Sequence, residues 1–220
     1  MGKKEYKLSE SCQIPRLGDI YHFFLGYKTD GVFVELGAFD GDMCSNTSGL
    51  ADIGWSGLYI EPVGVYYDKC VRRHKKNNVK VVNCAIGDVD GEADIHVGEA
   101  LSTMRDDVLK KFKSMSWSKR FHTGSKERVI VRQLNDVLVE AGICEGFDVL
   151  SLDVEGYEWN VLKNFNIQDW LPKIVVIELH DNNDNYPEEW DECNLIIDYF
   201  RRNDYRVVLK DFSNTVYARI

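Results

Sequence analysis

The chain has 220 residues, of which 44% are hydrophobic, a length and composition typical of one α/β domain with a full-sized core. Its 27 basic and 36 acidic residues give a net charge of −9, which disfavours nucleic acid as a substrate because it gives no general attraction for phosphate backbones. No apolar run approaches the ~18 residues of a membrane span, and the first residues, MGKKEYKLSES, lack the apolar stretch of a secretory signal. We therefore expect residues 1–220 to form a single soluble, cytoplasmic domain with no membrane partner.

The cysteines are scattered and include no C-x-x-C pair. We expect reduced, mostly buried thiols, as in a protein of the cytosol. The six positions are Cys12, Cys44, Cys70, Cys84, Cys144 and Cys193.

Residues 1–28 are predicted to be a helical lead-in to the domain. After a proline, Leu17, Ile20, Tyr21 and Phe24 fall on one face of a helix.

Beyond this lead-in, apolar segments alternate with amphipathic ones. Buried parallel strands joined by helical crossovers have this pattern. The predicted parallel strands are GVFVELG, GLYIEP, VKVVNCAIGD, FDVLSLDVEG and KIVVIELH, and the closing pair YRVVLKD and NTVYARI is predicted to be antiparallel. The pattern predicts a doubly wound, mostly parallel seven-stranded sheet, with GEADIHV as an extension of it. In such a sheet ligands bind at the carboxyl ends of the strands.

The loop after the first predicted strand combines glycines with acids. It is ELGAFDG, with Glu35, Gly37, Asp40 and Gly41 as its notable positions. A dinucleotide pyrophosphate favours G-x-G-x-x-G in neutral surroundings, and these carboxylates would repel it. A cation without phosphate would be attracted, and S-adenosylmethionine, with its sulfonium and ammonium groups, is such a ligand. The alternative is an ordinary strand-to-helix turn with solvated acids.

The second and third strands add to the predicted nucleoside site. Glu61 ends the second strand, at the spacing of a carboxylate that accepts hydrogen bonds from ribose hydroxyls. A role as a helix-cap partner is the alternative. By position alone, Cys84 or Ala85 at the end of the third strand would lie near an adenine ring.

Four blocks stand in a fixed order along the chain: VFVELGAFDGDMCSNTSGLADIGWSGLYIEP, VVNCAIGD, DVLSLDVEGYEWNVL and IVVIELH. In their order and spacing the chain, from roughly residue 29 to residue 209, resembles the FkbM-type methyltransferases, which use S-adenosylmethionine. The resemblance implies a Rossmann-like domain that transfers a methyl group to a hydroxyl oxygen of a sugar, a glycan or another small molecule.

The resemblance also implies residue roles. Glu61 would hold the ribose, and the methionine part would be lined by Glu35, Gly37, Asp40 and Gly41. One position departs from the family pattern: Ser151 stands where the family often has a lysine, so any role of that lysine is in doubt here.

The polar segment 98–127 interrupts the alternation of strands and helices. Its position after the third strand places it over the crevice, so we predict a substrate lid. A plain surface insertion is the alternative.

Acids and a histidine follow the fourth and fifth strands. Asp153 and Glu155 lie two residues apart, as do Glu178 and His180, so each pair shares a side of its strand. We expect Asp153 to contact the cofactor ammonium or the acceptor hydroxyl. Helix capping is the alternative role for the acids near Glu158.

This cluster suits methyl transfer to oxygen. Histidine, with an ordinary pKa near ~6.5, is a suitable base at neutral pH. We predict His180 as the base that takes the acceptor proton, with Glu178 or Asp153 orienting it. The same three side chains are the candidate ligands for Mg²⁺ or Mn²⁺. The rival functions are methylation of another small molecule or of a nucleic-acid end, and a catalytically silent cofactor-binding module.

Overall fold

A computed structural model describes residues 5–181, 183, 186 and 189–220. Its main sheet has seven strands in the order β3-β2-β1-β7-β8-β10-β9. The strands are β1 (Val32–Leu36), β2 (Ser56–Ile60), β3 (Val79–Val82), β7 (Val149–Leu152), β8 (Ile174–Glu178), β9 (Tyr205–Lys210) and β10 (Asn214–Arg219). All neighbouring pairs are parallel except the two that involve β10, which runs antiparallel to β8 and β9. The predicted fold class is confirmed.

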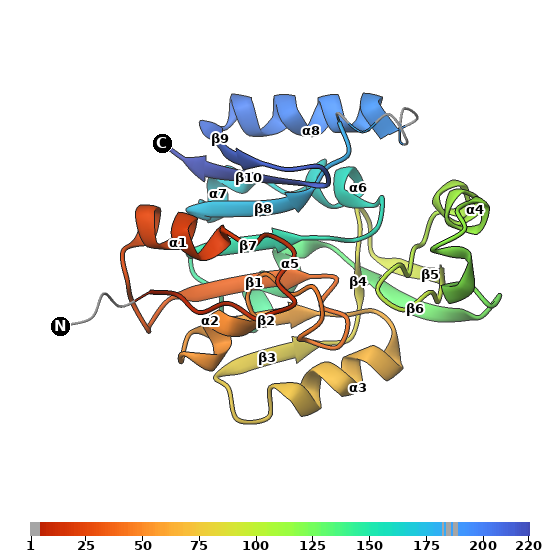
Figure 1. The fold of residues 1–220 in the computed structure, drawn as a ribbon, viewed down its shortest axis with the longest axis horizontal. Coiled ribbons are helices and arrows are strands. Elements are labelled where there is room, and N and C mark those ends of the chain that lie inside the picture. The colour runs from red at the N-terminus through yellow and green to blue at the C-terminus, as the bar shows by residue number, and fades with distance from the viewer. Residues whose placement is uncertain (1–4, 182, 184–185, 187–188) are drawn as a thin grey trace.

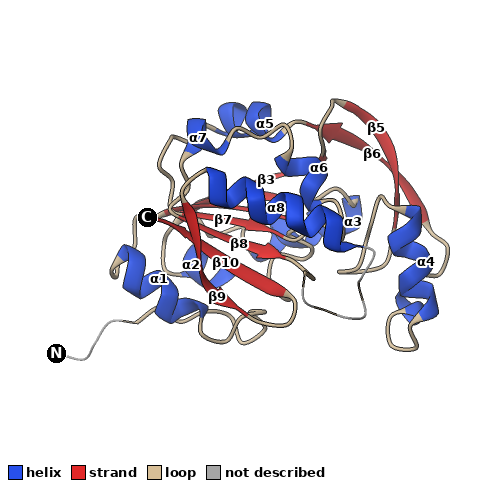
Figure 2. Ribbon diagram, turned by 90° about the horizontal axis from the view of Figure 1, so that it is seen from above, coloured by secondary structure: helices blue, strands red, loops and turns tan. Residues whose placement is uncertain are grey.

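Helices cover both faces of this sheet (Figures 1 and 2). Alternate strand residues point to opposite faces. Phe33 and Val149 thus pack with α1 (Leu17–Leu25), α2 (Ser48–Asp52) and α3 (Gly64–Arg73) on one side. The other face buries Val34 and Leu150 beneath α5 (Leu134–Ala141), α6 (Glu158–Leu162), α7 (Ile167–Trp170) and α8 (Trp190–Arg202). Full burial of each large apolar side chain contributes about 1.5–3 kcal/mol, so the two cores fix the sheet between its helices.

A second, three-stranded sheet corrects two predictions. Its order is β4-β6-β5, with β4 (Ala85–Ile86), β5 (Gly91–His96) and β6 (Lys126–Arg132). GEADIHV therefore pairs with β6 and does not extend the main sheet. The predicted third strand divides in two because Asn83 donates its side-chain amide to the carbonyls of Glu61 and Pro62, where the ladder with β2 ends.

The segment 98–127 lies beside this second sheet, near the carboxyl ends of the parallel strands. It contains α4 (Asp106–Ser114) and the 3₁₀ helix η1 (Lys119–Phe121). In Figure 1 the arrowheads of the parallel strands point toward α4, β5 and β6. Within the described ranges, no helix is both long enough and apolar enough to cross a lipid bilayer.

One glycine sets the distance between the loops that follow β1 and β7. Gly37 has φ +75°, and a Cβ built on it would lie 1.7 Å from the carbonyl oxygen of Asp153. The two strand ends approach so closely that only a residue without a side chain fits.

We therefore expect Gly37→Ala to lower the free energy of unfolding by more than its backbone conformation alone requires. Gly142 is a matched control, because its φ is +73° and nothing lies within 4 Å of a Cβ there. Gly142→Ala should cost about 1–2 kcal/mol, the penalty of the left-handed conformation, and Gly37→Ala clearly more. Denaturant midpoints of the two variants give the comparison; equal losses would contradict the close-approach explanation.

Candidate active site

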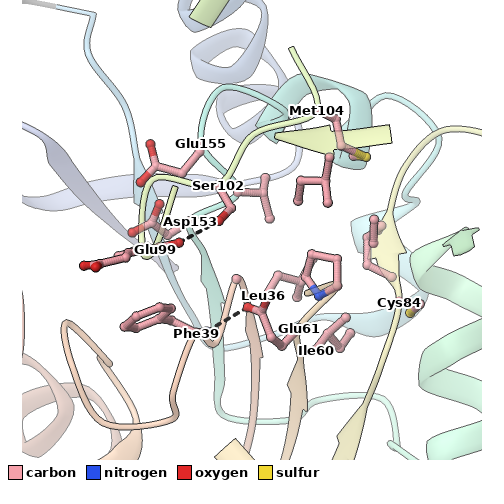
Figure 3. A pocket seen from close by; sticks show the side chains of 17 residues that line it. Leu36, Phe39, Ile60, Glu61, Cys84, Glu99, Ser102, Met104, Asp153 and Glu155 are labelled. Carbon is pink, nitrogen blue, oxygen red and sulfur yellow. Dashed lines mark hydrogen bonds between the residues drawn. The ribbon is translucent and has the colours of Figure 1, made fainter. Parts of the chain in front are cut away.

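A cleft opens at the carboxyl ends of β1, β2 and β7, and we call it the glycine-loop cleft. Counted to its open mouth, it holds about 550 Å³ of empty space. Its wall is completed by residues 84–86, by Ile95 and by Glu99, Ala100, Ser102 and Met104 of the predicted lid. None of its described lining residues is Lys, Arg or His, whereas Glu61, Glu99, Asp153 and Glu155 are acids. Figure 3 shows Asp153, Glu155 and Glu99 on one side of the cleft and Cys84 on the other.

Glu61 forms part of the wall and also fixes the glycine loop. Its two carboxylate oxygens accept hydrogen bonds of 2.8 Å from the backbone N–H groups of Phe39 and Val63. Burial raises the pKa of Glu61 to about 8, although both hydrogen bonds act in the opposite direction. The carboxylate thus lies at the end of β2, with its first bond visible in Figure 3.

Glu35 lies under the loop and does not line the cleft. It shares a strand face with Phe33 and is buried, so its carboxylate accepts hydrogen bonds from Ser45 Oγ at 2.9 Å, from the Asn46 N–H at 3.3 Å and from Thr47 Oγ1. Burial raises the pKa of Glu35 to about 7. This acid therefore holds the 45–47 turn against the sheet from inside.

Asp40 and Gly41 also lie outside the lining of the cleft. The carboxylate of Asp40 accepts hydrogen bonds from the N–H groups of Asp42 at 3.0 Å and Met43 at 2.9 Å, which closes the turn. The carbonyl of Gly41 lies 2.7 Å from His74 Nε2, against α3. Of the predicted cofactor residues, those that the structure gathers around the cleft are Gly37, Glu61, Cys84, Ala85 and Asp153.

Two further clefts adjoin the first. The β8 cleft, of about 440 Å³, lies between β8, α4, α6 and α8. The aromatic cleft, of about 950 Å³ to its mouth, is lined by Phe112, Trp117, Tyr186 and Phe212. Glu178 and His180 line both of these clefts, and Glu155 lines all three. The polar residues predicted at the ends of the fourth and fifth strands are therefore brought together, with Glu155 at their junction.

Three carboxylates converge at that junction. Asp153, Glu155 and Glu178 each place an oxygen within 4.8 Å of the others. Burial, and next the charge of Asp153, raise the pKa values of Glu155 and Glu178 well above the ordinary range. Burial also raises the pKa of Asp153. Like charges held this closely favour a bound proton or a bound cation.

The converging group differs from the predicted metal ligands in one member. Glu155 lies with Asp153 and Glu178 in this group, whereas the prediction named His180 with these two acids. The imidazole of His180 lies beside Glu178, with 3.6 Å between its Nε2 and Glu178 Oε1. On its other side Nδ1 is 2.9 Å from Glu189 Oε2, and the ring stacks on Tyr186 at 3.9 Å between centroids. These contacts hold the imidazole at the edge of the aromatic cleft.

Sequence reasoning missed the contribution of the N-terminal segment. Gln13 donates its amide to Asp153 Oδ2 at 2.7 Å. The amide of Asn46 donates to Gln13 Oε1 at 3.1 Å and to the hydroxyl of Ser151 at 3.3 Å. Ser151 stands where the family often has a lysine. In this chain the position is occupied by a hydroxyl that accepts a hydrogen bond from a neutral side-chain amide. No periodicity or spacing in residues 1–16 indicates the contact.

The buried Glu35 predicts a specific dependence of stability on pH. Since its pKa is about 7 in the folded chain and near ~4.3 when unfolded, the folded chain binds one more proton between these pH values. The free energy of unfolding therefore falls as pH rises through this window. Glu35→Gln removes the effect, so the variant should gain about 1–3 kcal/mol relative to the wild type between pH 5 and pH 8, with little further change above.

Urea unfolding of both proteins across this pH range measures the difference. Glu145→Gln is the control, because Glu145 is exposed. A stability difference between wild type and Glu35→Gln that stays constant with pH would show that Glu35 is ionised throughout.

The chain is similar to known proteins in its sequence family and in its fold. A family model described as "Methyltransferase FkbM domain" matches residues 35–207. No curated protein matches the sequence. Among solved structures, a Haemophilus influenzae protein assigned as a methylase has a TM-score of 0.50 at 10% identity, with 99% of each chain covered. This likeness concerns the fold alone.

Two other solved structures have lower TM-scores. Aeropyrum pernix fibrillarin, in complex with natively bound S-adenosyl-L-methionine, has a TM-score of 0.47 at 13% identity, covering 87% of this chain and 66% of that one. A TehB-like SAM-dependent methyltransferase from Corynebacterium glutamicum has a TM-score of 0.45 at 10% identity, covering 93% and 86%.

Proposed function

This chain belongs to the FkbM family of S-adenosylmethionine-dependent methyltransferases, and on that premise we propose that it methylates a hydroxyl oxygen of a sugar or glycan. The observation that supports the proposal is the pair of clefts joined at Glu155. One cleft is acidic and suits a cationic donor, and the other is aromatic and suits the acceptor.

The donor fits the glycine-loop cleft by charge. Its sulfonium and ammonium groups are cations and it has no phosphate, which matches a wall of acids without a described Lys or Arg. We assign the ribose to Glu61, whose carboxylate oxygens retain acceptor capacity beside their bonds to the loop. The adenine is assigned to the apolar wall at Cys84 and Ala85, and the ammonium to Asp153. Glu35, Asp40 and Gly41 support the loop from behind.

The lid proposed for residues 98–127 closes over both clefts. Glu99 and Met104 line the glycine-loop cleft, whereas Met115 and Trp117 line the aromatic cleft. The hydroxyl of Thr103 donates to the carbonyl of Glu155 at 2.8 Å. One segment therefore touches the donor site, the acceptor site and the residue between them, as a lid that excludes water requires.

The acid and histidine cluster supplies the proton chemistry. The bound donor presents an electrophilic methyl group, and the acceptor hydroxyl attacks it in line, so positioning matters most. We propose His180 as the base that takes the hydroxyl proton, with Glu178 and Asp153 orienting it. Glu189 at 2.9 Å from Nδ1 stabilises the imidazolium that forms.

The function is tested by methyl transfer from tritiated S-adenosylmethionine to a panel of glycans, methyl glycosides and nucleotide sugars. We expect the tritiated methyl group on a hydroxyl oxygen of a carbohydrate acceptor, and the same methyl-transfer activity before and after prolonged EDTA treatment. Loss of activity with EDTA and its recovery with Mg²⁺ or Mn²⁺ would instead indicate a metal held by the carboxylate cluster. Tight cofactor binding without transfer to any acceptor would favour a silent module, and label in RNA ends or another metabolite would favour those substrates.

His180→Asn tests the proposed base. General base catalysis is worth ~10²–10⁴-fold, so turnover should fall by about that factor while cofactor affinity stays within about threefold of the wild type. The exposed His22 provides the control variant His22→Asn. Near-normal turnover of His180→Asn would remove this histidine from the reaction.

A further inference from the structure

The aromatic cleft has a charge pattern that restricts the acceptor. Its lining includes the carboxylates of Glu155 and Glu178, and none of its described residues is Lys or Arg. A sugar phosphate or a nucleotide sugar would bring one or more negative charges to this wall. Recognition of phosphate normally uses Arg, Lys or a helix N-terminus.

Two lysines that contact residues in or beside the cleft are already engaged by acids or rings. Lys111 Nζ lies 3.3 Å from the ring centroid of Tyr186 and 3.8 Å from Glu189 Oε1. Lys210 pairs with Asp181. A phosphate in the cleft would therefore receive no compensating cation from either lysine.

A third cation, Arg105 of the lid segment, is also engaged. The Arg105 guanidinium lies 2.6 Å from Asp107 and 2.5 Å from Glu192. It also donates to the carbonyl of Gly156 at 2.9 Å, so it serves to fasten the lid to the loop after β7. The N–H donors of the Arg105 guanidinium are thus engaged by acceptors within the protein.

The apolar part of the lining suits a sugar ring. Trp117 and Phe212 remain 52% and 63% exposed although both line the cleft. Exposed aromatic side chains at the mouth of a cleft mark a binding surface. An aromatic face packs against the C–H face of a pyranose, while the carboxylates and the imidazole accept hydrogen bonds from its hydroxyls.

We propose that the acceptor is an uncharged sugar residue in a glycoside or glycan, bound against Trp117 and Phe212, and that sugar phosphates and nucleotide sugars are rejected. This inference rests on the proposed function, because it concerns the acceptor of that same methyl transfer. It places the enzyme after the glycosyl transfer that consumes the activated sugar, on a glycosidic product.

The first experiment compares matched acceptors. Methyl glycosides of common hexoses and 6-deoxyhexoses are assayed against the 1-phosphates of the same sugars, with tritiated S-adenosylmethionine as donor. For each sugar that is methylated, kcat/KM for the glycoside should exceed that for the phosphate by at least tenfold. Equal or greater use of the phosphates, or of the nucleotide sugars, would overturn the inference while leaving the methyltransferase function intact.

Variants at the mouth of the cleft test the binding surface. Trp117→Ala should raise KM for the glycoside about 10-fold to 100-fold, with cofactor affinity unchanged, and Trp117→Phe should restore most of it. Phe23→Ala is the control, because Phe23 is 80% exposed and lies outside the cleft. An unchanged KM in Trp117→Ala would contradict the proposed contact.

A charge variant gives the sharpest result. Ser116 lines the cleft, whereas the exposed Ser114 ends α4 outside it. Ser116→Lys should raise the use of the 1-phosphate relative to the glycoside about tenfold, and Ser114→Lys should not. Identical ratios in both variants would overturn the electrostatic explanation. Failure of the wild type to bind S-adenosylmethionine, or methylation of non-carbohydrate acceptors alone, would overturn the proposed function itself, whereas preferential methylation of sugar phosphates or nucleotide sugars would overturn only this inference.

Discussion

Three buried, converging carboxyl groups are the feature around which this site is built. Asp153 directly follows β7 and Glu178 ends β8, and these strands are parallel neighbours with Leu152 opposite Ile177. The pairing that forms the sheet therefore also brings the two acids together, and Glu155 joins them within 4.8 Å. Buried carboxyl groups held this closely lose their protons readily only beside a cation, so they favour a positively charged ligand. Membership of the FkbM family and the electrostatics of the cleft thus lead to the same class of methyl donor.

A second group of buried acids shapes the loop itself. Glu35 holds the 45–47 turn, and Glu61 holds the backbone at Phe39 and Val63. Both use backbone or hydroxyl donors of the protein, so the loop has its conformation before any ligand arrives. Ligand sites are commonly preformed in this way. The two acids act from different sides: Glu35 supports the loop from inside the core, and Glu61 supports it from the wall of the cleft.

Much of this arrangement could be predicted from the sequence. Apolar runs ending in Glu61 and Glu178 predicted the sheet and the acids at its carboxyl edge, because the alternation of strands and helices leaves a pattern in the sequence. Other features depend on three-dimensional geometry that the hydrophobic periodicity of the sequence does not indicate. Glu155 has φ +53°, a left-handed conformation that redirects its side chain. Glu35 alternates with apolar neighbours, but alternation does not tell which face of the strand meets the ligand. β6 has only two buried apolar residues among charges and was not predicted as a strand.

The amide of Gln13, which bonds to Asp153 across the edge of the sheet, has a consequence for how the protein is divided. The family match begins at residue 35, so a boundary drawn there would discard a side chain that bonds to an acid of the candidate active site. A shortened chain of that kind would leave the Asp153 carboxylate without the amide that now bonds to it, and the Asn46 amide without its acceptor on Gln13.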